Sequence, residues 1–504
     1  MRIIKTHEVI PEDIPDQWER DQIYNGTDVL ATRQVLDVIK PQLDELTRAT
    51  YDFSRALQGP VLEMRLRGVL VDEHRKQQVL DDYFDRIDTL ETQLEQIVLD
   101  GVGMPTFNPR SPPDLQKLFY GYLGIPPILK KGRPTTDRDA RERLAIFPVA
   151  KPIVAHLNAI ADLAAKIKFL KTGIDTDGRA RTSYNIAGTS TGRFSSSYSE
   201  FGTGGNLQNI EESLRSVFIA DRGWKFTKFD AKSGESYCVG GIEWNLFEDG
   251  RYLDAVESGD IHTAVARIRW PNLKWTGDLS RDKSVAEQPY YRHYSYRFMC
   301  KKLGHGSNYG GQPPTLAEQA KLPETVVRDF QPKYFRAFPS HIRWHGWVDN
   351  RLKREGNLIT LTGRKRWFFG RRNDPAVWRE AVAYDPQGSL ADIVNRAMLR
   401  IWRRLKQDAV PCYIMFQDHD ALTFMYREEM EDEIIPKLQA MLVEELPLAK
   451  GRALAIPYDC KVGWNKGEYS NDNPEGLKDY KGHDERTRAA EVTLVDRILH
   501  GKYG

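Results

Sequence analysis

The sequence has few cysteines, no long hydrophobic run and almost no excess charge of either sign. The four cysteines lie far apart, at Cys238, Cys300, Cys412 and Cys460. None forms a C-x-x-C pair, which argues against a zinc site and favours a reduced, cytoplasmic setting. No stretch resembles a secretory signal or a transmembrane helix, so we expect no membrane partner.

Balanced charge excludes a general electrostatic attraction to one class of partner. The chain has 73 Lys and Arg against 71 Asp and Glu, a formal net charge of +2. Any anion-binding surface must therefore come from local clustering. At 504 residues the chain is also too long for one ordinary core, so we expect two to four domains or subdomains.

Apolar spacing and turn residues predict an alternation of helical and extended regions. The expected helices lie within 24–100 with a break at 68–72, at 114–122 inside a loop-rich stretch, at 151–170, and over most of 284–370. The expected strands are 224–230 and a hairpin of 412–416 with 422–426, and residues 182–215 read as extended or turn. We expect the last thirty or so residues to be a loosely held polar tail.

Two aspartates far apart in the chain lie where apolar strands end. Asp230 follows the strand at 224–230, and Asp420 lies in the turn of the predicted hairpin. Carboxylates on such rigid ends suit hard cations such as Mg²⁺, and two of them can share a metal pair. Each aspartate by itself is more often only a strand end or a turn residue, so the pair needs support from other motifs.

A row of four polar or aromatic side chains lies between these aspartates. Arg297, Lys301, His305 and Tyr309 follow one another at four-residue spacing. On a helix this spacing places them on one slowly turning face. Arg and Lys can bind phosphate oxygens, and His and Tyr can stack on a base or sugar. A solvated helix face is the commoner reason for such a row, so this motif also needs its neighbours.

Taken together, the motifs resemble those of family A DNA polymerases, the bacterial polymerase I type. The segment 297–310 resembles the fingers-helix motif of that family, Asp230-Ala-Lys-Ser-Gly-Glu235 its first palm motif, and Gln417-Asp-His-Asp420 its last. Further matches occur in the same order as in the family. They are Thr191–Ser196, Asn206–Ile210, Arg215–Ala220, Asp260–His262, and Gln387-Gly388 with Ala391–Ile393.

The resemblance implies roles at the nucleotide. Asp230 and Asp420, with the carbonyl of Ala231, would hold two Mg²⁺ ions. Arg297 and Lys301 would bind the triphosphate of a dNTP, and Lys301 would protonate the pyrophosphate. The remaining nucleotide contacts would be Tyr309 beside the templating position, Glu235 against a ribose 2′-hydroxyl, His305, and His262 near the triphosphate.

The resemblance also implies contacts with primer–template DNA. Arg193 and Gln387 would donate to minor-groove acceptors, which offer hydrogen bonds largely independent of base sequence. His419 would hold the primer end and Arg379 the template. Gln208 and Asn209, in the segment before the first palm motif, complete the expected DNA-binding set.

Three departures from the family pattern concern the site. His305 replaces the usual Phe or Tyr, which opens the question of sugar discrimination. Gly304 adds flexibility to the helix at about 1 kcal/mol relative to Ala. Ala421 stands where the family usually has Glu, so an auxiliary carboxylate is missing there. Residues 198–205 read as an insertion in the loop before Asn206.

The N-terminus resembles only the end of another domain. Tyr24-Asn-Gly-Thr-Asp28 is similar to the last motif of the family's 3′–5′ exonuclease, but the preceding residues contain no Asp-x-Glu. A metal exonuclease needs several carboxylates. Either proofreading is absent or a separate polypeptide supplies it, and a processivity subunit is a further conceivable partner.

The resemblance implies an α+β, right-hand polymerase fold with a helical thumb, an antiparallel-sheet palm and helical fingers. The expected divisions are 1–72 as an N-terminal helical segment, 73–175 as thumb, 176–240 and 376–470 as palm, 241–375 as fingers, and 471–504 as the tail. The expected function is template-directed DNA synthesis in replication, in the cytoplasm and in a host cell if a phage encodes the protein. Two alternatives stay open: a single-subunit RNA polymerase, against which Glu235 argues, and a catalytically silent DNA-binding subunit.

Overall fold

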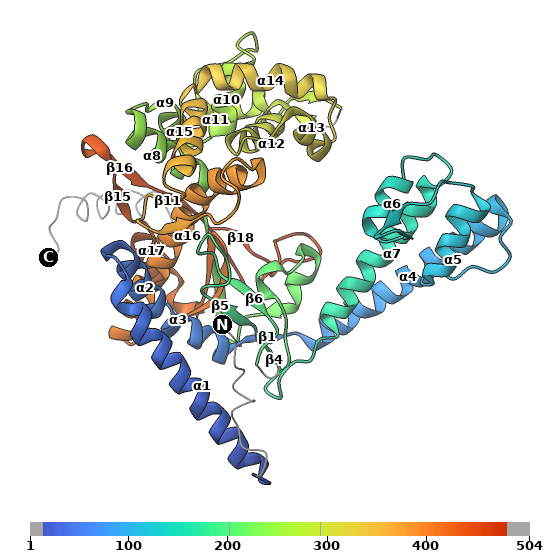
Figure 1. Ribbon diagram of the computed structural model, residues 1–504, viewed down its shortest axis with the longest axis horizontal. Coiled ribbons are helices and arrows are strands. Elements are labelled where there is room, and N and C mark those ends of the chain that lie inside the picture. The colour runs from blue at the N-terminus through green and yellow to red at the C-terminus, as the bar shows by residue number, and fades with distance from the viewer. Residues whose placement is uncertain (1–13, 201, 293, 481–504) are drawn as a thin grey trace.

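The computed structural model describes residues 14–200, 202–292 and 294–480. A central sheet carries a helical body at one end, a long helical arm at one side and an N-terminal helix that points away from both (Figure 1). Within the described residues, no helix is long and apolar enough to cross a membrane.

The central sheet has five antiparallel strands in the order β13-β14-β8-β17-β18. They are β13 (Cys412–Asp418), β14 (Ala421–Arg427), β8 (Trp224–Ala231), β17 (Tyr458–Gly463) and β18 (Lys478–Asp479). The predicted hairpin is confirmed, and its strands extend further than expected, so that only His419 and Asp420 form the turn. Register places Asp230 opposite Ala421 on one side and Asp459 on the other.

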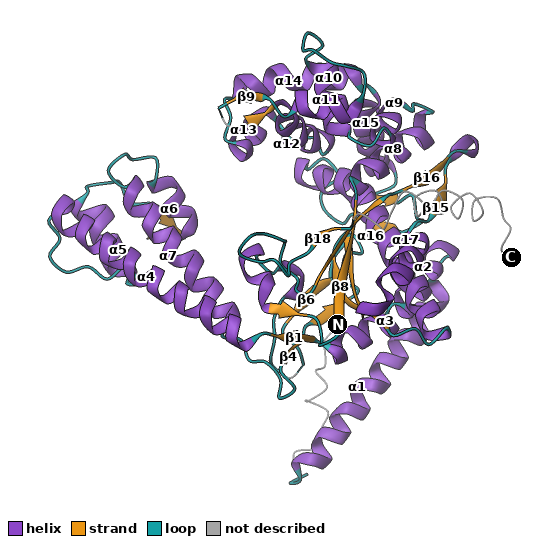
Figure 2. Ribbon diagram, turned by 180° about the vertical axis from the view of Figure 1, so that it is seen from behind, coloured by secondary structure: helices purple, strands orange, loops and turns teal. Residues whose placement is uncertain are grey.

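Aromatic side chains point to both faces of this sheet and pack it against a hydrophobic core on each side. Phe229 meets Phe424 on one face, and Phe226 meets Phe416 on the other, each pair edge to face. All four rings are buried, as expected for a strand whose successive side chains point to opposite faces. The 33-residue helix α16 (Pro375–Gln407) contacts β13 and β14, and it runs beside the sheet in Figure 2.

The arm is an antiparallel pair of long helices. Helices α4 (Glu73–Val102) and α7 (Lys151–Leu170) pack along their length, and the tip carries α5 (Pro112–Gln116), a π-helical turn η3 (Lys117–Tyr122) and α6 (Arg138–Leu144). The prediction of a helix at 151–170 is confirmed. The short tip helix begins two residues earlier than predicted, because Ser111 caps it and two prolines fit its first turn.

Small sheets close the base of the arm and the loops beside it. One sheet contains β1 (Val69–Val71), β4 (Arg179–Ala180) and β7 (Phe218–Ile219). Two further pairs are β2 (Leu129–Lys130) with β3 (Arg133–Pro134), and β5 (Ser183–Asn185) with β6 (Ser195–Ser197). The 3₁₀ turns η4 (Leu207–Asn209) and η5 (Glu212–Val217) follow. Residues 182–215 are thus short strands and turns, as predicted.

The helical body begins directly after Asp230. Its helices are α8 (Gly234–Phe247), α9 (Arg251–Glu257), α10 (Ile261–Arg269), α11 (Leu279–Ala286), α12 (Tyr296–Asn308), α13 (Pro313–Ala320), α14 (Glu324–Ala337) and α15 (Ser340–Arg354). Two hairpins accompany them, β9 (Pro289–Tyr291) with β10 (Tyr294–Ser295), and β11 (Asn357–Ile359) with β12 (Lys365–Trp367). Ser233 takes a left-handed conformation, φ 53°, where the chain leaves β8 for α8.

The N-terminal helices are α1 (Gln17–Ile39), η2 (Lys40–Gln42), α2 (Glu45–Ala56) and α3 (Gln58–Arg67). Helix α1 starts seven residues before the predicted position 24, because the Asp16 side chain accepts from the amide of Trp18 and caps it. None of its residues is buried. Tyr24 and Asp28 therefore lie on a helix that projects from the body (Figure 1).

The prediction of a loose tail from residue 471 is wrong for 471–480. Strand β18 pairs with β17, and Leu477 is 2% exposed in the core. Strand pairing, the buried Leu477 and the buried Asn473, whose amide exchanges hydrogen bonds with that of Asn465, fix this stretch although its composition is polar. Residues 481–504 lie outside the described residues.

The remaining elements are α17 (Glu431–Leu442), η6 (Glu428–Met430), η7 (Ala449–Gly451), and the hairpin β15 (Glu445–Pro447) with β16 (Ala453–Ala455).

Candidate active site

The fold brings the two predicted aspartates together. Asp230 ends β8, and Asp420 lies in the β13–β14 turn, where its carbonyl accepts from the amide of Ala231 at 3.0 Å. Burial, and then the negative charge of Asp230, raise the pKa of Asp420. The two carboxylates therefore repel each other, and a shared cation would relieve that repulsion.

The donor set at this position suits a cation that keeps much of its own coordination shell. Within the described part of the chain, no cluster of three or more His, Cys, Asp or Glu side chains could hold a metal. Two carboxylates with a backbone oxygen, completed by water and phosphate, is the kind of site that Mg²⁺ accepts. The residues present thus fit the expected metal without forming a closed protein cage.

The two aspartates open into one pocket of about 560 Å³ that holds most of the predicted nucleotide residues. The predicted residues that line it are Asp230, Ala231, Glu235, His262, Arg297, Lys301, His305 and Asp420. Charged residues that sequence reasoning did not place here also line it, namely Lys232, Asp260, Lys302 and Asp459. The row on α12 therefore faces the carboxylates across a cavity, as the four-residue spacing required.

Arg297, at the start of this row, is fixed by carboxylates on other elements. Its Nε lies 2.8 Å from Oδ2 of Asp260, and its Nη1 lies 3.4 Å from Oε1 of Glu287. Burial opposes the charge of Asp260, but hydrogen bonds from Arg297 and Thr263 lower its pKa overall. The guanidinium is therefore held beside the pocket, with further donors available to a phosphate.

Lys301 and His262 differ in what they can offer a phosphate. Lys301 is exposed, and no carboxylate of the described residues lies within ion-pair distance of it. Burial, together with the positive charge of Arg297, lowers the pKa of His262 to about 4. At neutral pH the imidazole of His262 is uncharged and can donate one hydrogen bond, whereas Lys301 contributes a full charge.

Glu235 is held by three side chains from other elements. Its carboxylate lies 2.5 Å from Nη2 of Arg193, accepts from the Tyr309 hydroxyl, and lies 3.8 Å from Nε2 of His305. Burial, and then the charge of Glu235, raise the pKa of the Tyr309 hydroxyl well above its ordinary value. The rings of His305 and Tyr309 meet edge to face at 5.0 Å. The predicted residues thus form one connected group around Glu235, of which Glu235 and His305 line the pocket.

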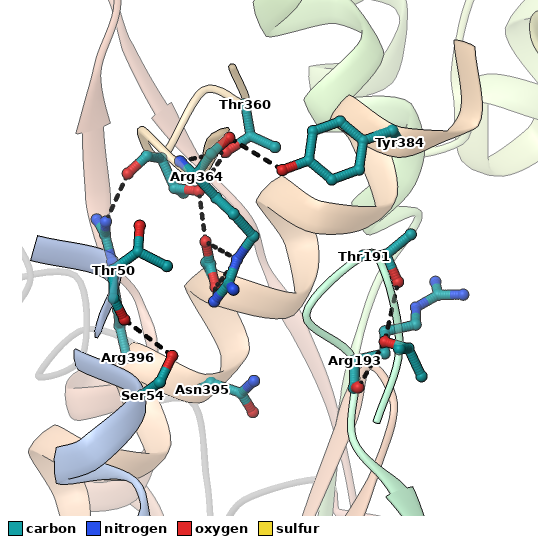
Figure 3. Close-up of polar contacts among 12 residues, drawn as sticks. Thr50, Ser54, Thr191, Arg193, Thr360, Arg364, Tyr384, Asn395 and Arg396 are labelled. Carbon is teal, nitrogen blue, oxygen red and sulfur yellow. Dashed lines mark hydrogen bonds and ion pairs between the residues drawn. The ribbon is translucent and has the colours of Figure 1, made fainter. Parts of the chain in front are cut away.

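A buried ion pair between Arg364, just before β12, and Asp392 of α16 lies beside the turn that carries Arg193 (Figure 3). Arg364 lies 2.7 Å from Asp392, which is 4% exposed, and the Tyr384 hydroxyl donates to the Arg364 carbonyl. Gly192, at φ 81°, lies against this guanidinium, where a Cβ would be 2.8 Å from its central carbon. A side chain at 192 would therefore displace Arg364, so glycine is required there.

Three expected DNA contacts, Gln208, Asn209 and His419, lie at the β13–β14 turn. Gln208, only 7% exposed, donates to the backbone and side-chain oxygens of Gln417 at 2.9 and 3.0 Å. Its amide braces the hairpin from inside and does not face the surface. Nε2 of His419 lies 3.5 Å from Oδ1 of Asn209, and His419 takes φ 63°. These two remain at the partly open edge of the turn.

Two other expected DNA contacts stand apart from the pocket. Arg379 is exposed near the start of α16, and Gln387 is partly buried further along the same helix. Gly388, beside Gln387, lies close to the Arg193 turn, because a Cβ there would be 3.2 Å from the Thr191 carbonyl oxygen. Gln387 thus lies near the Arg193 turn, and neither Arg379 nor Gln387 lines the pocket.

The structure shows which residues surround Gly304 and Ala421, two positions that depart from the family pattern. A Cβ at Gly304 would lie 3.6 Å from the Tyr334 ring, in ordinary contact, so space alone does not require glycine. Ala421 is 1% exposed directly opposite Asp230. Asp459, the other cross-strand neighbour of Asp230, is exposed in the pocket. Only the strand order could have revealed Asp459, because nothing in the local sequence links it to Asp230.

Known proteins match this chain over most of its length. The chain is 27% identical to a DNA polymerase I of Chloroflexus aurantiacus over 89% of this chain and 46% of that protein. It is 25% identical to a thermostable DNA polymerase I of Thermus aquaticus over 82% of this chain and 47% of that protein. The chain therefore spans about half the length of the curated relatives it matches.

A solved structure confirms the predicted α+β, right-hand polymerase fold. It is the POL domain of Pol1 from M. smegmatis in complex with DNA primer-template and dNTP, with a TM-score of 0.63. The sequence identity is 23%, over 82% of this chain and 69% of that one. The family model for DNA polymerase family A matches residues 75–469, which include all the predicted site residues of the pocket. The match covers well over half of the sequence, and the chain therefore belongs to DNA polymerase family A.

Proposed function

We propose that this protein is a template-directed DNA polymerase that adds dNTPs to a primer 3′ end. The observation that carries the proposal is the single pocket in which Asp230 and Asp420 face Arg297 and Lys301. A carboxylate pair opposite two phosphate-binding cations is the arrangement that nucleotidyl transfer requires. Family membership and the structural likeness to a domain bound to DNA primer-template and dNTP support the same activity.

The three parts of the fold would have the functions of thumb, palm and fingers. The arm within 73–175 would grip the duplex as the thumb, and the central sheet of 176–240 and 376–470 would be the palm. The helical body of 241–375 would be the fingers, although α8 begins at Gly234, so this boundary falls within a helix. Within the N-terminal segment 1–72, α3 contacts β13 and α16 and would support the palm from the side.

Asp230, Asp420 and the carbonyl of Ala231 would hold two Mg²⁺ ions. When bound, such ions activate the primer 3′-oxygen and stabilise the leaving pyrophosphate. The protein's own part is to orient the triphosphate: Arg297 presents a fixed fork to its oxygens, and Lys301 adds a mobile charge and a proton for the pyrophosphate. His262, neutral at pH 7, would add one hydrogen bond near the same phosphates.

The base and sugar of the nucleotide would lie over Glu235 and the two rings. Glu235 would exclude a ribose 2′-hydroxyl, since three neighbours prevent its carboxylate from moving aside. Tyr309 would stack beside the templating position, with His305 next to the incoming sugar. A side chain of this size at position 235 favours DNA synthesis over the RNA polymerase alternative.

The duplex would contact residues around the pocket. Arg193 and Gln387 would donate to the minor groove, Asn209 and His419 would hold the primer end, and Arg379 would meet the template. We assign Gln208 a positioning role, because its amide is occupied by Gln417 inside the protein.

Primer extension with the carboxylate variants tests this proposal. Asp230→Ala and Asp420→Ala should each lower the extension rate more than about a hundredfold, which corresponds to roughly 2.7 kcal/mol of transition-state stabilisation. Both variants should bind primer–template as the parent does, because the duplex contacts lie elsewhere. Asp472→Ala, at an exposed aspartate before β18, is the matched control and should extend normally.

The same assay separates the alternatives. Extension by the parent with dNTPs but not rNTPs supports a DNA polymerase, and efficient use of rNTPs would instead indicate an RNA polymerase. Tight primer–template binding without any extension, in the presence of Mg²⁺ or Mn²⁺, would indicate a silent DNA-binding subunit and refute the proposal.

A further inference from the structure

A lysine lies on the same face of the sheet as the predicted metal ligand. Lys228 precedes Asp230 by two residues on β8, so both side chains leave the strand on one side. Its Nζ lies 2.9 Å from Oδ2 of Asp230, and the side chains are 19% and 46% exposed. A cation of the protein itself is therefore in contact with the carboxylate that we assign to the metal.

Asp418 and Glu468 also attract this ammonium, but each of these two acids has a lysine of its own. Lys466, which is buried, lies 2.5 Å from Asp418 of β13, and Lys461 of β17 lies 2.5 Å from Glu468. Three lysine–carboxylate pairs thus stand side by side at this end of the sheet. The pair with Lys228 is the one whose carboxylate opens into the pocket.

The ammonium of Lys228 stays charged in this position. Burial works against its charge, but attraction to Asp230, with weaker contributions from Asp418 and Glu468, raises the pKa of Lys228 overall. Cross-strand neighbours of Lys228 are Thr423 and Lys461, neither of which competes for the ammonium as an acid. The positive charge also offsets part of the repulsion between Asp230 and Asp420.

We propose that Lys228 is a positioning residue that serves as the resident counter-ion of Asp230, so that a divalent cation binds there by displacing an ammonium. This inference rests on the proposed assignment of Asp230 as a metal ligand. Before the metal arrives, Lys228 holds the carboxylate in place and limits its repulsion from Asp420. Lys228 contacts Oδ2 of Asp230, so a divalent cation held by this carboxylate would share a small space with the ammonium and would weaken or break the Lys228–Asp230 contact.

The exchange has a cost for metal binding in the absence of nucleotide. Breaking a partly exposed ion pair and placing a cation beside the freed ammonium should weaken binding by about fivefold or more, which corresponds to about 1 kcal/mol. The negative charge of a triphosphate would compensate for the ammonium. Metal loading at Asp230 would thereby be coupled to nucleotide binding.

Direct Mn²⁺ binding to the full chain, measured by electron paramagnetic resonance without DNA or nucleotide, tests the exchange. Lys228→Met removes the ammonium and should bind Mn²⁺ about fivefold more tightly than the parent. Lys228→Arg keeps the charge and should bind as the parent does. Lys437→Met removes an exposed lysine that pairs with Glu433 on α17 and does not line the pocket, and should leave the affinity unchanged.

Thermal unfolding provides a second readout. In EDTA, Lys228→Met should melt at a lower temperature than the parent, because Asp230 and Asp420 then repel each other without a counter-ion. Saturating Mn²⁺ should raise its melting temperature by more than it raises that of the parent. If circular dichroism shows that Lys228→Met does not fold, Lys228→Gln replaces it, with the same expected outcomes.

The outcomes distinguish this inference from the proposed function. Loss of Mn²⁺ binding in Asp230→Asn, with parental affinity in folded Lys228→Met, would overturn the role of Lys228 and leave the metal site standing. Parental Mn²⁺ binding by Asp230→Asn would overturn the metal site itself, and the Lys228 proposal with it. Tighter binding by Lys228→Met and parental binding by Lys437→Met support the exchange.

Discussion

Replacing Glu235 should remove most of the selectivity for dNTPs over rNTPs. To admit a 2′-hydroxyl, the parent carboxylate would have to leave Arg193 and the Tyr309 hydroxyl, which both contact it. Hydrogen bonds that involve a charged group contribute about 1.5–3 kcal/mol each, so losing both would cost roughly 3–6 kcal/mol. At about 1.4 kcal/mol per factor of ten, this is a selectivity of roughly 10² to 10⁴. Glu235→Ala should lose that selectivity.

Glu235→Gln is the matched variant, because it keeps the size of the side chain and removes only its charge. Its selectivity should lie between those of the parent and Glu235→Ala, since the bulk remains but the contacts with Arg193 and Tyr309 weaken. Glu235→Ala should also lose about tenfold in dNTP incorporation, because the Tyr309 hydroxyl is left without its partner.

Single-nucleotide incorporation with matched dNTP and rNTP gives the ratio of kcat/KM values for each variant. The reasoning predicts the order parent, Glu235→Gln, Glu235→Ala for decreasing selectivity. A ratio for Glu235→Ala within about threefold of the parent would refute the steric role, whatever happens to the absolute rate. Equal losses in both variants would instead assign the selectivity to the charge.

Three further predictions concern other residues. His305→Phe should change the discrimination against dideoxynucleotides, because the imidazole lies between Glu235 and the Tyr309 ring; unchanged incorporation ratios would leave His305 with a packing role only. The protein should not shorten a labelled primer in Mg²⁺, since the residues before Tyr24 contain no Asp-x-Glu motif; shortening that is lost in Asp28→Ala would contradict this. Burial lowers the pKa of His345 to about 4, below its value near 6.5 in the unfolded chain. The stability that comes from burying the neutral imidazole is therefore complete above about pH 6.5 and is lost as the pH falls toward 4. His345→Gln should make urea unfolding less dependent on pH across that window, and an identical dependence would show that His345 is not responsible.

Local sequence determined the elements of this site because each has a signal within a few residues. Strand endings located Asp230 and Asp420, and four-residue spacing placed Arg297, Lys301 and His305 on one helix face, as α12 confirms. The order of these motifs along the chain led to the family, which the match over residues 75–469 shows.

Short segments with few apolar residues were harder to predict. The polar stretch 471–480 was expected to be a tail, yet β18 pairs there with β17, and the buried Leu477 and Asn473 hold it. Gln208 was expected at the DNA surface, but its amide is enclosed by Gln417, which is 209 residues away in sequence. Pairing over such distances leaves no periodicity in the local sequence.

Strand order decided what surrounds the predicted aspartates. Lys228 and Asp230 are two residues apart, and this spacing in the sequence places both on one face of a strand. The sequence did not show which acids pair with the neighbouring lysines. Only the arrangement β14-β8-β17 places Asp459 beside Asp230, and only the tertiary fold brings Tyr309, at the end of α12, to Glu235 at the start of α8. The sequence by itself determined which side chains can do the chemistry, because residue type and local spacing are written there. The tertiary structure decided their charge environment, because electrostatic interaction depends on distances that distant strands and helices set.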